Sequence, residues 1–183
     1  MTPSRYDDEL WELVPEEPGP PPEPLRRFVR SLGHAERALD LGCGDGRLSD
    51  ELDATELTAA DVSPVALARA ARRLPNARIA ELEPDAPLPF DDGSFDLVLC
   101  AETIEHVRDV QLFLSEIRRV LRPGGTLALS TPAHLPLARL PDPLSPHLRL
   151  LSRHSLRRLL DQLGFGVASL RRRSGTLFAL ATR

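Results

Sequence analysis

A glycine-rich turn that carries acids is the stretch of this sequence whose residue types and spacing best suit a ligand. Residues 39–46 read LDLGCGDG, with three alternating glycines, Gly42, Gly44 and Gly46. Such turns after a strand often hold phosphate, because they expose backbone N–H groups. The same turn contains two carboxylates, Asp40 and Asp45, which would repel a phosphate. We therefore expect a ligand of another kind.

The glycine spacing also argues against a dinucleotide. The NAD fingerprint needs glycines at relative positions one, three and six, and position six here is Arg47. A ligand with an adenosine, a positive charge and no phosphate removes the conflict with the two acids. S-adenosylmethionine has a sulfonium and an ammonium group, so the turn favours this cofactor. A tight turn without any ligand is the alternative.

A further carboxylate follows at a suitable distance along the chain. Asp61 ends the run LTAAD, about 20 residues after the first glycine, where a carboxylate can accept from ribose hydroxyls. It also precedes Ser63 and Pro64, which signal the start of a helix. A helix-capping role for Asp61 is therefore the alternative.

A third polar group lies in AETIEHV, residues 101–107. Glu102, Glu105 and His106 form an ExxEH set, and His147 comes later in the chain. Two carboxylates and two imidazoles suit Mg²⁺ or Zn²⁺. Without a metal, His106 can serve as a general base or cap the following turn. We expect His106 to be catalytic, with Glu102 and Glu105 beside it, and keep these four residues as a candidate metal site.

The elements that must position these residues alternate between strands and helices. Apolar runs predict five strands and a final hairpin, at residues 37–41, 57–61, 77–82, 95–100, 126–130 and 166–183. Helical spacing and cap signals predict helices at 25–32, 63–74, 110–121 and 155–165, and the start of one at 48–52. This alternation predicts an α/β doubly wound sheet that is parallel apart from the hairpin. Ligands bind such sheets at the carboxyl ends of the strands, where the candidates lie.

Composition and charge narrow the function classes. A chain of 183 residues with net charge −4 predicts one domain with no general attraction to nucleic acid or to an anionic membrane. Two cysteines, Cys43 and Cys100, do not make a secreted disulfide framework and are expected in the core. The N-terminus has no apolar signal region, and no apolar run approaches the ~20 residues of a membrane span. We expect a cytoplasmic protein, a monomer or homodimer.

The chain resembles the class I S-adenosylmethionine-dependent methyltransferases, within them the small-molecule, type 11-like branch. Five segments carry the resemblance, in order over residues 38–165: ALDLGCGDGRLS, LTAADVSP, LPFDDGSFDLVLCAETIEHV, LRPGGTLALSTP and LRRLLDQLGF. It implies a Rossmann-like sheet of seven strands in the order 3-2-1-4-5-7-6. The seventh strand should be antiparallel, with helices on both faces.

The resemblance also implies the residues that meet the cofactor. Those around its methionine part are Asp40, Gly42, Cys43, Gly44 and Gly46, with Ala101 nearby. Asp61 should hold the ribose, and Val62 should pack on the adenine. Glu81 and Leu82 stand at the adenine edge. Because the following loop is longer than usual, Glu83 and Asp85 compete with Glu81 for that role.

The expected reaction is methyl transfer from S-adenosylmethionine to an O or N atom of a small molecule, with S-adenosylhomocysteine as product. Residues 1–24, with a proline-rich linker at 15–24, form an N-terminal segment that often acts as a lid in this family. Residues 25–183 form the single methyltransferase domain, and its insert 132–149 should hold the acceptor. The expected acceptor contacts are Tyr6, Trp11 and His147.

Three other functions stay open. Metal-dependent quinone O-methyltransferases and small-RNA 2′-O-methyltransferases have a similar ExxEH-then-His set. Metal-dependent 2′-O-methylation of RNA ends is therefore one alternative. A non-catalytic protein that binds S-adenosylmethionine is the second, and an NAD-dependent oxidoreductase is the third.

Overall fold

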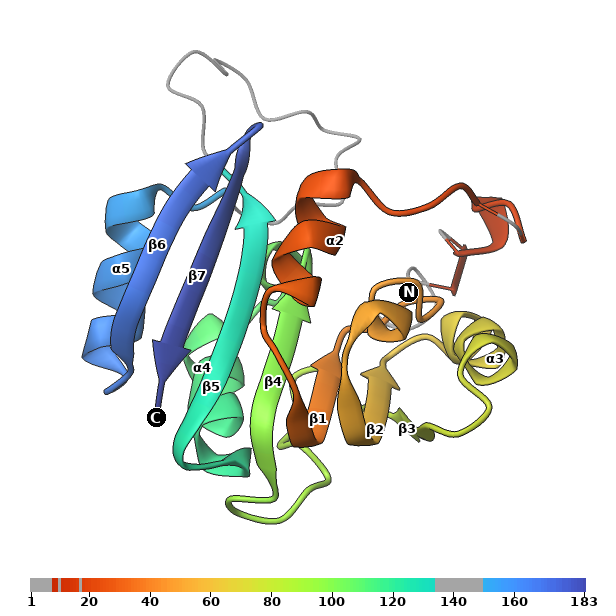
Figure 1. Cartoon of the computed structure of the whole chain (residues 1–183), viewed down its shortest axis with the longest axis horizontal. Helices are drawn as coiled ribbons and strands as arrows, with labels where there is room; N and C mark the ends of the chain where they lie inside the picture. Colours follow the sequence, from red (N-terminus) through yellow and green to blue (C-terminus); the bar gives the residue numbers. More distant parts are fainter. Residues whose placement is uncertain (1–7, 10, 17, 134–149) are drawn as a thin grey trace.

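One seven-stranded sheet organises the chain. The structure is a computed structural model that describes residues 8, 9, 11–16, 18–133 and 150–183. The strand order is β3-β2-β1-β4-β5-β7-β6 (Figure 1). β7 is antiparallel to both neighbours, and the other four pairings are parallel. The order and the antiparallel seventh strand confirm the expected architecture.

The bounds of the elements agree closely with the alternation in the sequence. The strands are β1 (Ala35–Leu41), β2 (Ala54–Asp61), β3 (Arg78–Glu81), β4 (Phe95–Ala101), β5 (Leu121–Pro132), β6 (Gly166–Arg173) and β7 (Thr176–Thr182). The α-helices are α2 (Glu23–Arg30), α3 (Pro64–Arg73), α4 (Val110–Val120) and α5 (Arg153–Gln162). Two short 3-10 helices are η1 (Ser49–Glu51) and η2 (Ile104–His106).

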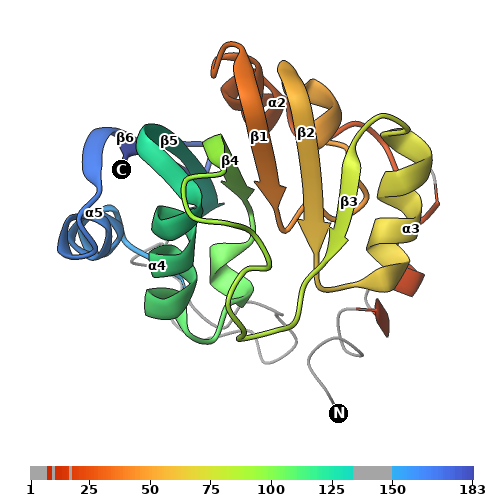
Figure 2. The same ribbon diagram turned by 90° about the horizontal axis from the view of Figure 1, so that it is seen from below.

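Helices cover both faces of the sheet. α2 and α3 lie on one face, and α4 and α5 lie on the other (Figures 1 and 2). In β4, Leu97 and Leu99 pack toward α2, whereas Val98 and Cys100 pack toward α4. A strand buried on both faces reads as a continuous apolar run, which is why FDLVLC was recognisable as a central strand.

Local cap signals fix the starts of the helices. The Ser63 side chain accepts from the Ala66 N–H at 3.2 Å, and Pro64 takes the first helical position of α3. The Asp109 carboxylate accepts from the Leu112 N–H at 2.9 Å and begins α4. These caps satisfy backbone donors that have no partner within the helix.

The helix expected to start at 48–52 is a single turn, η1. Leu52 has an extended backbone, and β2 begins at Ala54, so no room remains for further turns. Glu51 is held instead by two arginines of α2, with 2.7 Å from Arg26 Nε and 2.5 Å from Arg30 Nε. A contact with a distant element thus replaces the local helical continuation.

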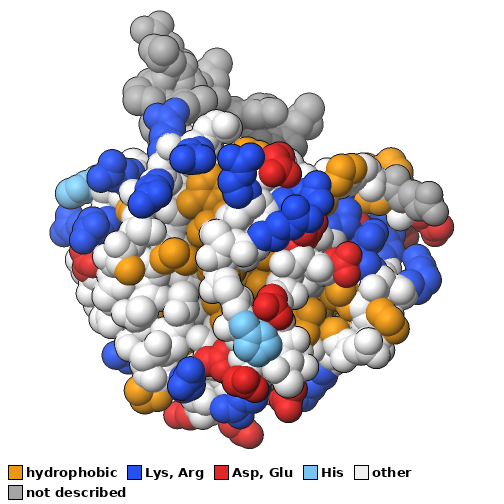
Figure 3. Space-filling model, viewed as in Figure 1, with side chains coloured by type: hydrophobic (Ala, Val, Ile, Leu, Met, Phe, Trp, Pro, Cys, Tyr) orange, Lys and Arg blue, Asp and Glu red, His pale blue; other side chains and the backbone are white. Residues whose placement is uncertain are grey.

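The edge strand β6 carries exposed arginines. Arg171, Arg172 and Arg173 are all exposed, and Figure 3 shows basic side chains, all of them arginines in this chain, gathered over β6 and α5. Charged side chains on an edge strand oppose pairing with another chain. No helix in the described part of the chain is long and apolar enough to cross a membrane.

A carboxyl group is buried in the middle of the sheet. Asp40 of β1 is 2% exposed, and its Oδ2 accepts from Ser49 Oγ at 2.6 Å. Burial raises the pKa of this carboxyl from an ordinary value of 3.8 to about 7, and the nearby Asp61 adds to the rise. The native chain therefore keeps this proton at pH values where the unfolded chain has lost it.

Asp40→Asn should flatten the dependence of stability on pH. Because the native state binds the extra proton between about pH 4 and 7, the wild-type chain loses stability as pH rises through that window. Asparagine stays neutral and can still accept from Ser49. Relative to wild type, the variant should gain more than about 1 kcal/mol between pH 5 and pH 8.

Urea unfolding of the ligand-free proteins at these two pH values measures the change. Asp50→Asn is the control, because Asp50 is exposed on η1. An equal response of both variants to pH would show that Asp40 ionises normally.

Candidate cofactor and active site

A cavity of about 370 Å³ lies at the carboxyl ends of β1, β2 and β4. Its walls include five of the residues expected to meet a cofactor, together with the expected catalytic histidine. These are Gly42, Gly44, Asp61, Val62, Leu82 and His106. The sheet therefore brings together candidates that lie up to 64 positions apart in the sequence.

The glycine turn has the left-handed backbone that glycine adopts at no steric cost. Gly42 has φ of 79° and Gly44 has φ of 55°. A Cβ on Gly42 would lie 2.3 Å from Thr103 Cγ2, and a Cβ on Gly44 would lie 2.6 Å from Trp11 Cζ2. Side chains are thus excluded at both positions, and the bare backbone faces the cavity.

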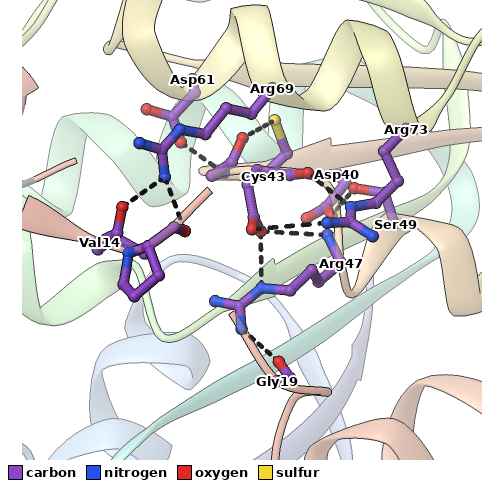
Figure 4. A network of polar contacts seen from close by, with 12 residues as sticks. Val14, Gly19, Asp40, Cys43, Arg47, Ser49, Asp61, Arg69 and Arg73 are labelled. Atoms are coloured by element: carbon purple, nitrogen blue, oxygen red, sulfur yellow. Dashed lines mark hydrogen bonds and ion pairs between the residues drawn. The ribbon is translucent and has the colours of Figure 1, made fainter. Parts of the chain in front are cut away.

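Asp61 is the acid that faces the cavity and also braces the turn. Its Oδ2 accepts from the Gly44 N–H at 2.8 Å (Figure 4). Its Oδ1 accepts from the Ser63 N–H at 3.0 Å. Burial raises the pKa of this carboxyl, while the backbone donors oppose the rise. Each carboxylate oxygen has a second acceptor position beyond the one used here. The capping contact and ligand binding are therefore compatible.

The other two acids of the turn are engaged inside the protein. Asp40 contacts Ser49, as described above, and is not among the cavity-lining residues. Asp45 Oδ1 accepts from Arg47 Nε at 2.9 Å, and Arg73 Nη2 lies 3.9 Å from Asp45 Oδ2. Figure 4 shows these arginines around the turn. Cys43 and Gly46 of the turn, and Ala101 at the end of β4, do not line the cavity either.

The loop after β3 supplies acids at the far end of the cavity. Glu81 pairs with Asp61 in the sheet register and is exposed, and it does not line the cavity. Glu83 and Asp85 do line it, beside the buried Leu82. Of the three competing carboxylates, the structure thus brings Glu83 and Asp85 to the cavity.

The chain leaves β4 through a strained residue. Glu102 has φ of 52°, which a non-glycine residue rarely adopts. This backbone turns its carboxyl to accept from Ser130 Oγ at 2.8 Å, at the end of β5. Burial raises the pKa of Glu102, which lines the cavity.

Glu105 and His106 lie together on η2. Glu105 is 1% exposed, its Oε2 accepts from Thr131 Oγ1 at 2.9 Å, and burial raises its pKa to about 7. Its Oε1 has no hydrogen-bond partner among the described residues and lies 4.0 Å from His106 Nε2. The His106 side chain is 38% exposed and lines the cavity, whereas Glu105 lies behind it.

The described residues contain no group of three or more His, Cys, Asp or Glu side chains placed to hold a metal ion. The carboxyls of Glu102 and Glu105 accept hydrogen bonds from Ser130 and Thr131, two adjacent residues of β5. His147, the fourth candidate ligand, lies outside the described residues, as do Tyr6 and most of the insert 132–149.

Several lining residues were not anticipated from the sequence. They are Val14, Thr103, Val107, Leu112 and Phe113. Leu112 and Phe113 lie in the first turn of α4 and are partly buried, and their residue types do not distinguish them from core positions of the same helix. Trp11, which was anticipated, lines the cavity beside Val14.

Comparison with known proteins identifies the family. Residues 39–129 match the family model described as a methyltransferase domain. A Mycolicibacterium smegmatis protein named probable S-adenosylmethionine-dependent methyltransferase is 37% identical over 133 residues, covering 70% of this chain and 51% of that protein. The mitochondrial ubiquinone biosynthesis O-methyltransferase of Schizosaccharomyces pombe is 34% identical, covering 61% of this chain and 43% of that protein.

A solved structure supports the fold independently. It is a complex of a Haloferax volcanii methyltransferase with the Trm112 methyltransferase activator. It superposes with a TM-score of 0.75 at 20% identity, covering 85% of this chain and 87% of that chain. This chain spans about half the length of the curated relatives it matches. From the sequence match and the shared sheet order together, the chain belongs to the S-adenosylmethionine-dependent methyltransferase family.

Proposed function

We propose that the chain is an enzyme that transfers the methyl group of S-adenosylmethionine to an oxygen or nitrogen atom of a small molecule. The observation that carries the proposal is that Asp61 and His106 line one cavity. A carboxylate suited to ribose hydroxyls and a titratable imidazole therefore face the same space. The chain belongs to the S-adenosylmethionine-dependent methyltransferase family, which argues against an NAD-dependent oxidoreductase.

The residues present fit the cofactor. Asp61 keeps acceptor positions for the two ribose hydroxyls, and it lines the cavity. The cavity wall is acidic. Among the described residues, five carboxyl groups line it, and Arg108 is the one arginine that does. The five are Asp61, Glu83, Asp85, Glu102 and Asp109. Such a wall favours a cationic ligand, and a volume of about 370 Å³ is in the range of small-molecule sites.

His106 is the residue we propose as general base. The cofactor supplies an electrophilic methyl group whose leaving group is a neutral thioether. The chain then has to align the acceptor, which can contribute roughly 7–11 kcal/mol, and to take up its proton. His106 faces the cavity for that purpose, and the Glu105 carboxyl 4.0 Å from its Nε2 can stabilise the imidazolium that forms. Glu102 is placed to accept a hydrogen bond from the acceptor.

The charge of the wall also bears on the acceptor. Two carboxyl groups, Glu102 and Asp109, line the cavity on the side of His106. They disfavour an acceptor that is itself a carboxylate, because like charges repel at short range. Hydroxyl or amine acceptors are compatible with them. A relative named as an O-methyltransferase supports the hydroxyl.

The remaining parts of the proposal concern the whole chain. We propose residues 1–24 as a lid with linker, residues 25–183 as the catalytic domain and 132–149 as the acceptor-binding insert. We also propose a cytoplasmic location, which the free thiols of Cys43 and Cys100 in the core support, and a monomer or homodimer. A non-catalytic binding protein and a metal-dependent RNA methyltransferase are the alternatives that the experiments below separate.

Asp61→Ala should weaken binding of S-adenosylhomocysteine at least tenfold. The substitution removes hydroxyl contacts to a charged acceptor, each worth roughly 1.5–3 kcal/mol, and it also releases the Gly44 N–H. Titration calorimetry measures the affinity. Asp50→Ala is the matched control, because Asp50 is exposed on η1 and does not line the cavity. Unchanged affinity in Asp61→Ala would contradict the ribose assignment, and tight binding of NAD to wild type would contradict the cofactor.

His106→Ala should lower turnover about 100-fold or more, with cofactor affinity nearly unchanged, because it removes the base and leaves the Asp61 side intact. A screen of phenols, quinols, amines and carboxylates, read by formation of S-adenosylhomocysteine, supplies the acceptor. The control is His154→Ala, an exposed histidine on α5. Full activity in His106→Ala would make this residue structural.

The same assay tests the metal and the non-catalytic alternatives. Loss of activity on chelation, restored by Mg²⁺ or Zn²⁺, with His147→Ala matching His106→Ala, would establish metal dependence. Cofactor binding without turnover on any acceptor of the panel, including RNA ends, would favour a binding protein.

A further inference from the structure

The N-terminal residues lie against α3, a helix that follows them by more than fifty positions. We call Asp8, Glu9 and residues 11–16 the strap. Asp8 Oδ1 accepts from Ser63 Oγ at 2.5 Å and from the Val65 N–H at 3.5 Å. The strap therefore begins at the N-terminal end of α3, directly after Asp61 and Val62 of the cavity wall.

Arg69, near the middle of α3, holds the other end of the strap. Its Nη1 donates to the Val14 carbonyl at 2.9 Å and to the Pro15 carbonyl at 3.2 Å (Figure 4). Its guanidinium carbon lies 5.9 Å from the centre of the Trp11 ring. One side chain thus contacts both the backbone and the aromatic residue of the strap, which the planar guanidinium suits.

The strap forms one wall of the cofactor cavity. Trp11 and Val14 line the cavity, and the Trp11 ring covers Gly44 so closely that a Cβ there would lie 2.6 Å from it. Gly44 is the residue whose N–H binds Asp61. The indole therefore rests on the backbone that the cofactor must approach, and the cavity keeps its volume of about 370 Å³ with the indole in place.

Burial of apolar side chains contributes little to the packing of the strap against the rest of the protein. Leu13 points outward with 82% of its surface exposed, and Trp11 and Val14 are partly buried. A segment with few buried apolar contacts opens at low cost in free energy. Polar contacts to α3 must therefore supply much of what keeps the strap closed.

We propose that Arg69 is a positioning residue that clamps the strap onto α3 and so keeps Trp11 as a wall of the cofactor cavity. Through this contact α3, which directly follows Asp61, also holds the strap over the cavity. The clamp slows release of bound cofactor and limits access of water to it. The inference rests on the family's cofactor and is independent of the methyl acceptor and of His106.

Arg69→Gln tests the clamp, and Arg72→Gln is the matched control. Arg72 lies on the same helix and is exposed, so its loss changes charge and helix composition in the same way. Trp11 is the one tryptophan of the chain, so its emission reports the strap directly. In the absence of cofactor, Arg69→Gln should shift this emission to longer wavelength, whereas Arg72→Gln should match wild type.

Cofactor release gives the second readout. Stopped-flow dilution of bound S-adenosylhomocysteine should show release about tenfold faster or more in Arg69→Gln, since hydrogen bonds from a charged donor are lost. Arg69→Lys keeps the positive charge but lacks the planar guanidinium. Its release rate should lie between those of wild type and Arg69→Gln. Asp8→Asn, which loosens the other attachment of the strap, should change emission and release in the same direction. Equal melting temperatures of Arg69→Gln and Arg72→Gln check that the core is intact.

Three results would overturn the clamp. One is wild-type emission and release in Arg69→Gln. Another is slower release or tighter binding in that variant, which would mean that Trp11 competes with the cofactor. A third is equal effects of Arg69→Gln and Arg72→Gln. Failure of wild type itself to bind S-adenosylhomocysteine would contradict the cofactor instead, and the emission of the ligand-free proteins would still decide the clamp.

Discussion

The contact between the end of β2 and the glycine turn is the constraint on which the site depends. The Gly44 N–H donates to Asp61 at 2.8 Å, and the Gly42 and Cys43 N–H groups both donate to the Ala60 carbonyl. Three backbone donors of the turn are thereby committed to the neighbouring strand. These hydrogen bonds fix the path of the turn and hold the Asp61 carboxylate beside it. Without this contact, neither the bare backbone nor the carboxylate would have a defined place.

This constraint also resolves the conflict of charge within the turn. A phosphate cradle would offer its N–H groups to the ligand, whereas here those groups serve Ala60 and Asp61. Asp45 is balanced by Arg47 and Arg73 on the protein side. The carboxyl groups that line the cavity are those of Asp61 and of the loops that follow β3 and β4. The turn has the glycines of an anion site but presents the charge of a cation site.

Local signals account for the parts that the sequence predicted well. The caps Ser63 and Asp109 act within four residues. Asp61 lines the cavity because it is the last residue of β2, a position that the local pattern predicts. The parts it missed depend on distant contacts. The helix at 48–52 ends after one turn because the backbone is extended at Leu52 and β2 begins at Ala54, which pairs with Ala35 of β1. Which acids reach the cavity depends on the path of the loop after β3, and the left-handed backbone of Glu102 has no signature in its residue type.

α3 therefore connects features that the sequence presents as separate. Its first turn follows Asp61 and Val62, its cap Ser63 donates to Asp8, and Arg69 holds the strap. The floor of the cavity and its cover thus share one rigid element. With the proposed clamp in place, we expect a change at the end of β2 to alter the strap through α3, and a displaced strap to alter the end of β2. Such reciprocity is required of any two sites that share one equilibrium.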